Sequence, residues 1–181
     1  MKPISEYFFQ YSDKHIHPYL EVYDLLIGDK DIQSVLEIGV LHGGSMWLWH
    51  SWFPDVQITG VDIIVPRGPL PPNVSMIISD IKRLKPNGCW DLIIDDGSHK
   101  LEDQLWVLNN FYECLTDIGI LIIEDVLGEA RAAELIEQFR GNKQYLHIID
   151  RRFAGCSADD MLLVYKPSPK RDKEGQNVDA S

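Results

Sequence analysis

The sequence predicts a doubly wound α/β fold, with one mostly parallel, seven-stranded sheet covered by helices on both faces. Two observations predict it. Short apolar runs of strand length alternate with longer stretches of helical periodicity, and a parallel crossover requires a connection of helix length. The chain has 181 residues, 45% of them hydrophobic, which is enough for one domain with a core of ordinary size.

The first half of the chain begins with a helix and continues as strand–helix units. Apolar spacing predicts the opening helix from Tyr19 to Ile27, ended by Gly28 and Asp29. The following segments are a strand over Ser34 to Ile38, a glycine loop over Gly39 to Gly44, a helix over Ser45 to Phe53, strands over Val56 to Val61, Val74 to Ile78 and Trp90 to Ile94, and a loop over Pro66 to Pro72.

The second half repeats the alternation. It should contain a helix over Leu101 to Leu115, a strand over Ile120 to Ile123 that begins next to Gly119, a helix striped by Ala132 to Phe139 and capped by Gly141, and strands over Tyr145 to Ile149 and Met161 to Tyr165. We expect residues 1–166 to form the domain. The polar tail, residues 167–181, has no apolar periodicity and is expected to be disordered.

Composition disfavours several classes of partner. A net charge of −11 and a pI near 4.8 repel a phosphate backbone, so we expect no nucleic acid. No apolar run approaches the roughly 20 residues of a membrane span and no secretory signal is visible, which predicts a cytoplasmic protein without a membrane partner. Cys89, Cys114 and Cys156 form no CxxC pair and are expected to be reduced.

Ligands of such sheets bind beyond the carboxyl ends of the strands, and most strands here end at an acid or a glycine. Leu41 replaces the second glycine of a dinucleotide fingerprint, and no Walker lysine follows, so a cofactor with phosphates is disfavoured. Asp62 lies where a carboxylate accepts from ribose, and Asp80 where one accepts from adenine. The predicted nucleoside site comprises Glu37, Gly39, Gly43, Ser45, Asp62, Asp80 and Asp95. The alternative is that acids at strand ends only cap helices.

Four acids end the fourth and fifth strands: Asp95, Asp96, Glu124 and Asp125. Neighbouring strands lie about 5 Å apart, and crowded carboxylates need a compensating cation. Hard oxygen ligands select Mg²⁺, Ca²⁺ or Mn²⁺ over Zn²⁺, with Mg²⁺ or Mn²⁺ the expected ion. Since successive strand residues face opposite sides, Asp96, Glu124 and Asp125 are the predicted ligands.

His99 follows Asp96 by three residues, and we expect both at the catalytic centre, with His99 as a general base for an acceptor hydroxyl. The alternative is that His99 or Ser98 caps the next helix and the acids are solvated. Two further histidines, His15 and His17, and Tyr19 precede the first helix and could close over a ligand.

Five segments carry a family resemblance, in chain order: SDKHIHPYLEVYDLL, VLEIGVLHGGSMWLW, FPDVQITGVDI, DLIIDDGSH and IIEDV. Together they resemble the macrocin and mycinamicin sugar O-methyltransferases and the related cephalosporin hydroxylase-like proteins, a family of class I methyltransferases with a Rossmann-like fold. The resemblance implies S-adenosylmethionine and magnesium as cofactors, Asp96, Glu124 and Asp125 as metal ligands, His99 as the base, and Glu37, Gly39, Asp62 and Asp80 around the cofactor.

The expected partner is a small hydroxylated acceptor, such as a sugar of a natural product or glycan. A catechol-type acceptor, a cofactor-binding partner subunit without its own catalysis and a metal-dependent hydrolase stay open as alternatives, as does a homo-oligomer.

Overall fold

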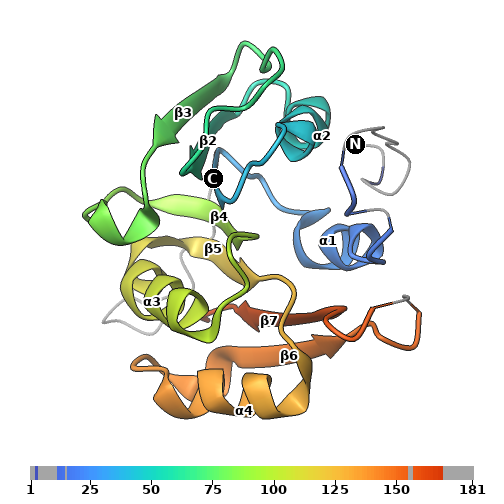
Figure 1. Cartoon of the computed structure of the whole chain (residues 1–181), viewed down its shortest axis with the longest axis vertical. Helices are drawn as coiled ribbons and strands as arrows, with labels where there is room; N and C mark the ends of the chain where they lie inside the picture. The colour runs from blue at the N-terminus through green and yellow to red at the C-terminus, as the bar shows by residue number, and fades with distance from the viewer. Residues whose placement is uncertain (1–2, 4–11, 15, 155–156, 169–181) are drawn as a thin grey trace, which may run out of the picture.

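Seven strands form one sheet in the order β3-β2-β1-β4-β5-β7-β6. The computed structural model describes residues 3, 12–14, 16–154 and 157–168. In Figure 1 the sheet extends from β3 at the top of the view to β6 and β7 at the bottom. The predicted doubly wound, mostly parallel sheet is therefore confirmed.

The helices and strands follow the predicted alternation. In chain order they are α1 (Leu20–Ile27), β1 (Ser34–Ile38), α2 (Gly44–Trp52), β2 (Gln57–Asp62), β3 (Val74–Ile78), the 3₁₀ turn η2 (Ile81–Arg83), β4 (Trp90–Asp95), α3 (Leu101–Phe111), η3 (Tyr112–Cys114), β5 (Leu115–Ile123), α4 (Gly128–Gln138), η4 (Lys143–Tyr145), β6 (Leu146–Asp150) and β7 (Met161–Tyr165).

Strand β1 lies beside the central strand β4, at the point where the order of the strands reverses. It pairs in parallel with β2 on one side and with β4 on the other, and only β7 runs antiparallel to its neighbours β5 and β6. The chain leaves β1 for one half of the sheet and returns at β4 for the other, so the crevice at their carboxyl ends is the expected ligand site.

The pleat of the sheet divides the core into two layers. Side chains such as Val35, Ile94 and Ile122 pack on one face with α1 and α2, whereas Leu36 and Ile93 pack on the other face with α3 and α4. Because successive strand residues face opposite sides, every buried strand contributes to both layers. The expectation of helices on both faces is thus correct (Figure 1).

The predicted start of the strand near Gly119 and the predicted end of the helix before it are wrong. Strand β5 starts at Leu115, so Gly119 lies inside the strand, opposite a register shift between Trp90 and Leu92. A Cβ on Gly119 would come within 2.7 Å of the Trp90 carbonyl oxygen, which explains the glycine. The preceding helix consequently ends at Phe111 rather than Leu115.

Helix α4 also differs, since it begins at Gly128 and has Phe139, not Gly141, as its C-cap residue. Gly141 instead lies against the rings of Phe139 and Tyr112, where a Cβ would clash.

Several expectations fall outside the described residues, namely those for His15, Cys156 and nearly all of the C-terminal tail. Cys89 and Cys114 are free thiols. Among the described residues, no helix combines the length and apolarity that a membrane span requires.

Candidate active site

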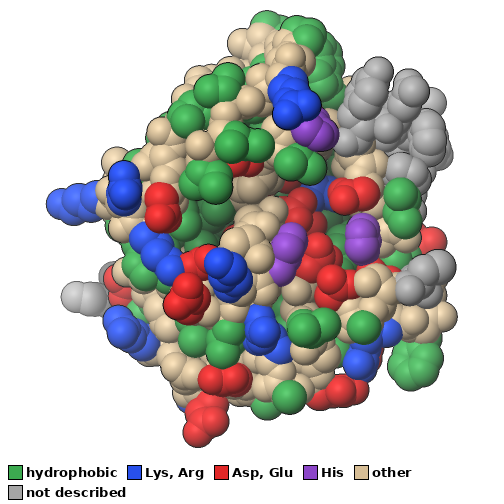
Figure 2. All heavy atoms as spheres, in the orientation of Figure 1, with side chains coloured by type: hydrophobic (Ala, Val, Ile, Leu, Met, Phe, Trp, Pro, Cys, Tyr) green, Lys and Arg blue, Asp and Glu red, His purple; other side chains and the backbone are tan. Residues whose placement is uncertain are grey.

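A cleft of about 1640 Å³ lies at the carboxyl ends of β1, β2, β3, β4 and β5. Figure 2 shows acidic and histidine side chains gathered in the hollow of this face. Most of the predicted site residues line it: Gly39, Gly43, Ser45, Asp62, Asp80, Asp95, Asp96, His99 and Asp125. Glu37 and Glu124 do not line it, and both are almost completely buried.

The turn after β1 has an unusual backbone. Gly39 and Gly43 have φ angles of 87°, and Leu41 between them has a φ of 49°. A Cβ on Gly39 would lie 2.0 Å from the carbonyl oxygen of Asp96, so only glycine lets this turn pack against the loop after β4. The glycine at position 39 therefore joins the two loops that bound the cleft.

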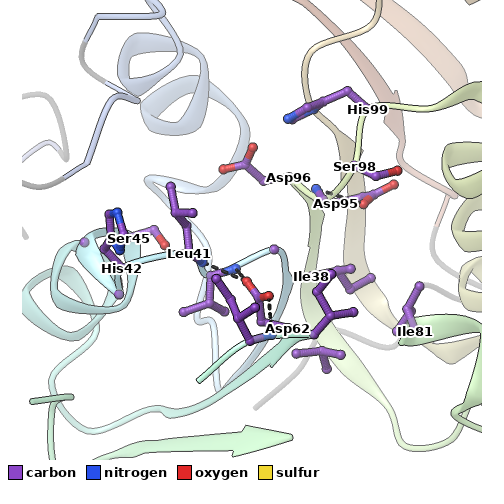
Figure 3. Close-up of a pocket in the computed structure, with 18 of the residues that line it drawn as sticks. Ile38, Leu41, His42, Ser45, Asp62, Ile81, Asp95, Asp96, Ser98 and His99 are labelled. Carbon is purple, nitrogen blue, oxygen red and sulfur yellow. Dashed lines mark hydrogen bonds between the residues drawn. The ribbon is translucent and has the colours of Figure 1, made fainter. Parts of the chain in front are cut away.

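Asp62 holds this turn from the end of β2. Its Oδ2 accepts from the backbone amides of Val40 and Leu41, both at 2.8 Å, and its Oδ1 accepts from Ile64 at 3.0 Å (Figure 3). Burial would raise the pKa of Asp62, but these amides lower it overall, so the carboxylate is ionised. A carboxylate offers about four acceptor positions, so capacity is left for a ligand hydroxyl.

Two further predicted cofactor contacts differ in their surroundings. Asp80 is exposed, and its Oδ1 accepts from the backbone amide of Lys82 at 2.9 Å, as a cap of η2. Asp95 is buried, and within the described part of the chain its Oδ2 has no hydrogen-bond partner. Burial raises the pKa of Asp95 to about 7. Asp95 therefore borders the cleft, but the unpartnered oxygen itself is buried.

The end of β4 separates the two adjacent acids. Asp95 and Asp96 point away from each other, as alternation along a strand requires (Figure 3). Asp96, His99 and Asp125 each offer a ligand atom, and these atoms lie within 4.8 Å of one another. The two carboxylates at this spacing suit a small divalent ion, since Mg²⁺ prefers oxygen donors, and the imidazole lies beside them.

Two of these three residues have strained backbone conformations. His99 and Asp125 have φ angles of 56° and 52°, which non-glycine residues adopt at a cost. Nδ1 of His99 lies 3.6 Å from Oδ2 of Asp125, whose other oxygen accepts from the Tyr19 hydroxyl at 2.7 Å. The side chain of His99 does not cap α3, whose N-cap is Lys100 without a side-chain hydrogen bond. The Asp125 carboxylate therefore lies beside the imidazole, just beyond hydrogen-bond distance.

Lys14 is the unexpected member of the acidic cluster. Its Nζ lies 2.6 Å from Oδ2 of Asp96, 2.7 Å from Oε2 of Glu124 and 3.5 Å from Oε1 of Glu37. The side chain is 1% exposed. The other oxygen of Glu124 accepts from the Tyr23 hydroxyl. Glu124, one of the predicted metal ligands, thus has both oxygens engaged by protein groups.

In this cluster, burial shifts each pKa in one direction and the charge of the ion-pair partner shifts it in the other. Burial alone would lower the pKa of Lys14, but Asp96, Glu124 and Glu37 raise it well above its ordinary value, so Lys14 remains an ammonium ion. Burial raises the pKa of Glu124 and of Glu37, and the Lys14 charge counteracts the rise in both. Trp49 Nε1 donates to Oε2 of Glu37, whereas Oε1 has no hydrogen-bond partner within the described residues and faces Lys14 only as an ion pair at 3.5 Å.

The segment before α1 contributes to the site in a different way from that expected. His17 Nδ1 contacts Asp160 at 2.6 Å, and neither His17 nor Tyr19 lines the cleft. Ser12, Asp13 and Ile16 line it instead. No sequence pattern indicated a functional role for Lys14 or Tyr23. The alternation of residues along a strand does indicate where their partners lie, because Glu37 and Glu124 share the sheet face that α1 and α2 cover.

Comparison with known proteins gives a sequence match and a fold. No family model matches the chain. A 106-residue stretch is 28% identical to the 8-demethyl-8-(2-methoxy-alpha-L-rhamnosyl)-tetracenomycin-C 3'-O-methyltransferase of Streptomyces olivaceus, and covers 51% of this chain and 27% of that protein. The resemblance to sugar O-methyltransferases is thereby confirmed.

Solved methyltransferase structures share the fold. MycE methyltransferase from the mycinamycin pathway, in complex with Mg, SAH and mycinamycin VI, matches with a TM-score of 0.62 and 21% identity, over 87% of this chain and 53% of MycE. A protein described as a ribosomal RNA methyltransferase of Plasmodium falciparum matches with a TM-score of 0.61 and 17% identity, over 89% of this chain and 100% of its own. The chain spans about half of MycE and about a quarter of the tetracenomycin enzyme.

Proposed function

We propose that the protein is an S-adenosylmethionine-dependent O-methyltransferase that acts on a hydroxyl of a small molecule, in particular a sugar of a natural product or glycan. The observation that carries the proposal is the composition of the cleft. One wall has the Gly39 turn tied to Asp62, and the other has Asp96, His99 and Asp125. A nucleoside site thus faces a cluster suited to activating a hydroxyl.

The cofactor belongs on the β1–β2 side of the cleft. The carboxylate of Asp62 keeps acceptor capacity for ribose, and the Gly39 turn presents backbone without a Cβ. Asp80 lies at the end of β3, where its exposed carboxylate can accept from a base edge, and Asp95 borders the cleft at the end of β4. S-adenosylmethionine has no phosphates, which suits a cleft so rich in acids.

A divalent ion, Mg²⁺ or Mn²⁺, would be held by the carboxylates of Asp96 and Asp125, with Glu124 as a third ligand once it is released by Lys14. When bound, such an ion acts as a Lewis acid that lowers the pKa of an acceptor hydroxyl. The two carboxylates also orient the acceptor, because a hydroxyl anchored beside them lies next to the imidazole of His99.

His99 is the proposed general base. Asp125 holds its Nδ1 side, which leaves Nε2 to take the acceptor proton. As the proton leaves, the acceptor oxygen forms a bond to the methyl carbon, and the bond from that carbon to sulfur breaks. The positive charge formed on His99 is balanced by Asp125.

The acceptor has room beside the cofactor, since the cleft exceeds the 300–1,000 Å³ of ordinary ligand pockets. Its lining includes apolar side chains that are largely exposed, at 62% for Ile16, 59% for Leu41 and 73% for Ile63. Apolar side chains beside a polar centre suit a hydroxyl carried on an apolar scaffold, as in a glycosylated natural product. The match to a rhamnosyl-tetracenomycin methyltransferase supports the same class.

A second function is favoured by the contact of Lys14 with Glu124, which gives the acidic cluster a cation of its own. The chain would then be a cofactor-binding subunit without independent catalysis. In that case S-adenosylhomocysteine binds, but methyl transfer requires another protein.

Transfer of radiolabelled methyl groups from S-adenosylmethionine to a panel of rhamnosides and catechols tests the proposal. We expect transfer to a rhamnoside with Mg²⁺, and its loss after EDTA treatment and in Asp96→Asn. Asp55→Asn is the matched control, because Asp55 is an exposed acid outside the cleft. Transfer that survives complete metal removal would contradict the metal dependence, and transfer to no acceptor despite cofactor binding would favour the subunit.

A further inference from the structure

Lys14 lies at the point where a divalent ion would have to be in order to touch Asp96 and Glu124 together. Its Nζ is within 2.7 Å of a carboxylate oxygen of each. These are the distances of charge-assisted hydrogen bonds. An ion bound to the same two oxygens would need the space that the ammonium group fills.

We propose that Lys14 and the divalent ion are alternative occupants of the Asp96–Glu124 pair, so that Lys14 sets how tightly the site binds metal. The inference rests on the proposed function for the role of the metal, but the competition itself concerns only binding. Lys14 acts here as a positioning residue, since it controls the availability of two carboxylates.

The burial of the partners explains why one cation must always be present. Glu37 and Glu124 are 0% and 1% exposed, and Lys14 is the cation that contacts both. Among the described residues, Lys14 is the charged group paired with these carboxylates, and removing the charged partner of a buried carboxylate is strongly destabilising. A divalent ion can replace Lys14 in this role because it carries more charge, but two cations side by side would repel each other.

The remaining ligands explain why metal can still enter. Asp96 has a second oxygen, its side chain is 22% exposed, and the side chain of Asp125 beside it is 14% exposed. Metal can therefore dock first on Asp96 and Asp125, and gain Glu124 only as Lys14 withdraws. The apparent affinity for metal then equals the intrinsic affinity multiplied by the fraction of the protein in which Lys14 has withdrawn.

Binding of Mn²⁺, measured by electron paramagnetic resonance of the free ion, tests the competition. Lys14→Met should bind Mn²⁺ at least about tenfold more tightly than the wild-type chain, because the competing charge is gone. Lys100→Met is the control. Lys100 is an exposed lysine at the cleft, its loss changes the net charge equally, and we expect a change of less than about twofold.

Equal affinity of the wild type and Lys14→Met would overturn the proposal, as would an absence of Mn²⁺ binding in both. If Lys14 had only a structural role, the variant would be less stable but would not bind Mn²⁺ more tightly.

A second measurement does not depend on the variant, whose stability falls because a buried counterion is lost. Acetic anhydride labels accessible lysines of the wild-type chain, and mass spectrometry quantifies each site. Lys14 should be protected without metal and labelled several-fold faster at saturating Mn²⁺, while Lys100 should be labelled at the same rate in both states. Protection of Lys14 that persists at saturating Mn²⁺ would overturn the proposal.

Failure of this inference and failure of the proposed function can be told apart. If methyl transfer is found but saturating Mn²⁺ does not displace Lys14 from the carboxylates, only the proposed competition is wrong. If Lys14 yields to Mn²⁺ but calorimetry detects no binding of S-adenosylhomocysteine, the competition stands and the proposed function is wrong.

Discussion

Gly39→Ala should unfold the protein more easily and abolish cofactor binding, although it adds a single methyl group. Gly39 lies in the turn between β1 and α2, where its φ of 87° belongs to the left-handed region. An added Cβ would meet the Asp96 carbonyl oxygen at 2.0 Å, its carbon at 2.5 Å and Gly97 Cα at 2.8 Å. All three are backbone atoms, so no side-chain rotation relieves the clash.

The magnitude follows from two costs. The left-handed conformation costs alanine roughly 1–2 kcal/mol relative to glycine, and forcing an additional carbon against packed backbone costs about 1–3 kcal/mol. Their sum is roughly 2–5 kcal/mol, a large part of the roughly 5–15 kcal/mol that stabilises a domain. Relief of the clash would also separate the two loops that bound the cleft.

Urea unfolding followed by tryptophan fluorescence gives the change in stability, and calorimetry with S-adenosylhomocysteine gives the loss of affinity. Gly68→Ala is the matched control, because Gly68 also lines the cleft but an added Cβ there meets nothing within 4 Å. We expect the control to change stability by less than about 1 kcal/mol. A Gly39→Ala protein with the stability and affinity of the wild type would refute the close contact of the two loops.

Three further substitutions test separate parts of the site. His99→Ala should lower the rate of methyl transfer by roughly 10²–10⁴-fold and leave the calorimetric affinity for S-adenosylhomocysteine unchanged, as loss of a general base requires; loss of affinity as well would contradict that role. Asp62→Asn should weaken S-adenosylhomocysteine binding by about tenfold or more, since the ribose loses a charged acceptor, and unchanged affinity would move the nucleoside elsewhere. Burial lowers the pKa of His17, but the hydrogen bond to Asp160 raises it above its ordinary 6.5 overall. The His17 contribution to stability is therefore full below pH 6.5 and lost as pH rises through the higher folded value. In urea unfolding, His17→Asn should accordingly be about 1 kcal/mol less stable than wild type at pH 5.5 and equal to it at pH 9; a deficit independent of pH would rule out this contact as the cause.

The architecture could be predicted from the sequence because local patterns determine it. Short apolar runs predicted the strands and helical periodicity predicted the helices. Their alternation implied parallel pairing, which makes the carboxyl ends of β1, β2 and β4 neighbours. That step alone brought Asp62, Asp96 and His99 to one cleft.

Gly119 shows where local patterns fail. A glycine normally breaks a strand, but this one lies inside β5, where the carbonyl of Trp90 leaves no room for a Cβ. Such a contact between distant residues depends on the register of two strands, and the sequence contains no local trace of it.

The sequence predicts that acidic residues at the ends of the strands form a group, but it does not predict the contacts of each one. The pleat places Glu37 and Glu124 on the face that α1 covers, where Lys14 and Tyr23 reach them. A consistent use of strand parity would have separated Glu124 from Asp125. Lys14 itself could not be predicted, because its role depends on how the segment before α1 packs over the ends of β1, β4 and β5, and no periodic pattern encodes that packing.

The most direct test of the central claim is a crystal structure of the protein grown with S-adenosylhomocysteine and Mg²⁺. We expect one nucleoside in the cleft, its ribose on Asp62 and its sulfur directed toward His99, with the ion on Asp96 and Asp125. A nucleoside bound at any other edge of the sheet, or none at saturating concentration, would contradict the account.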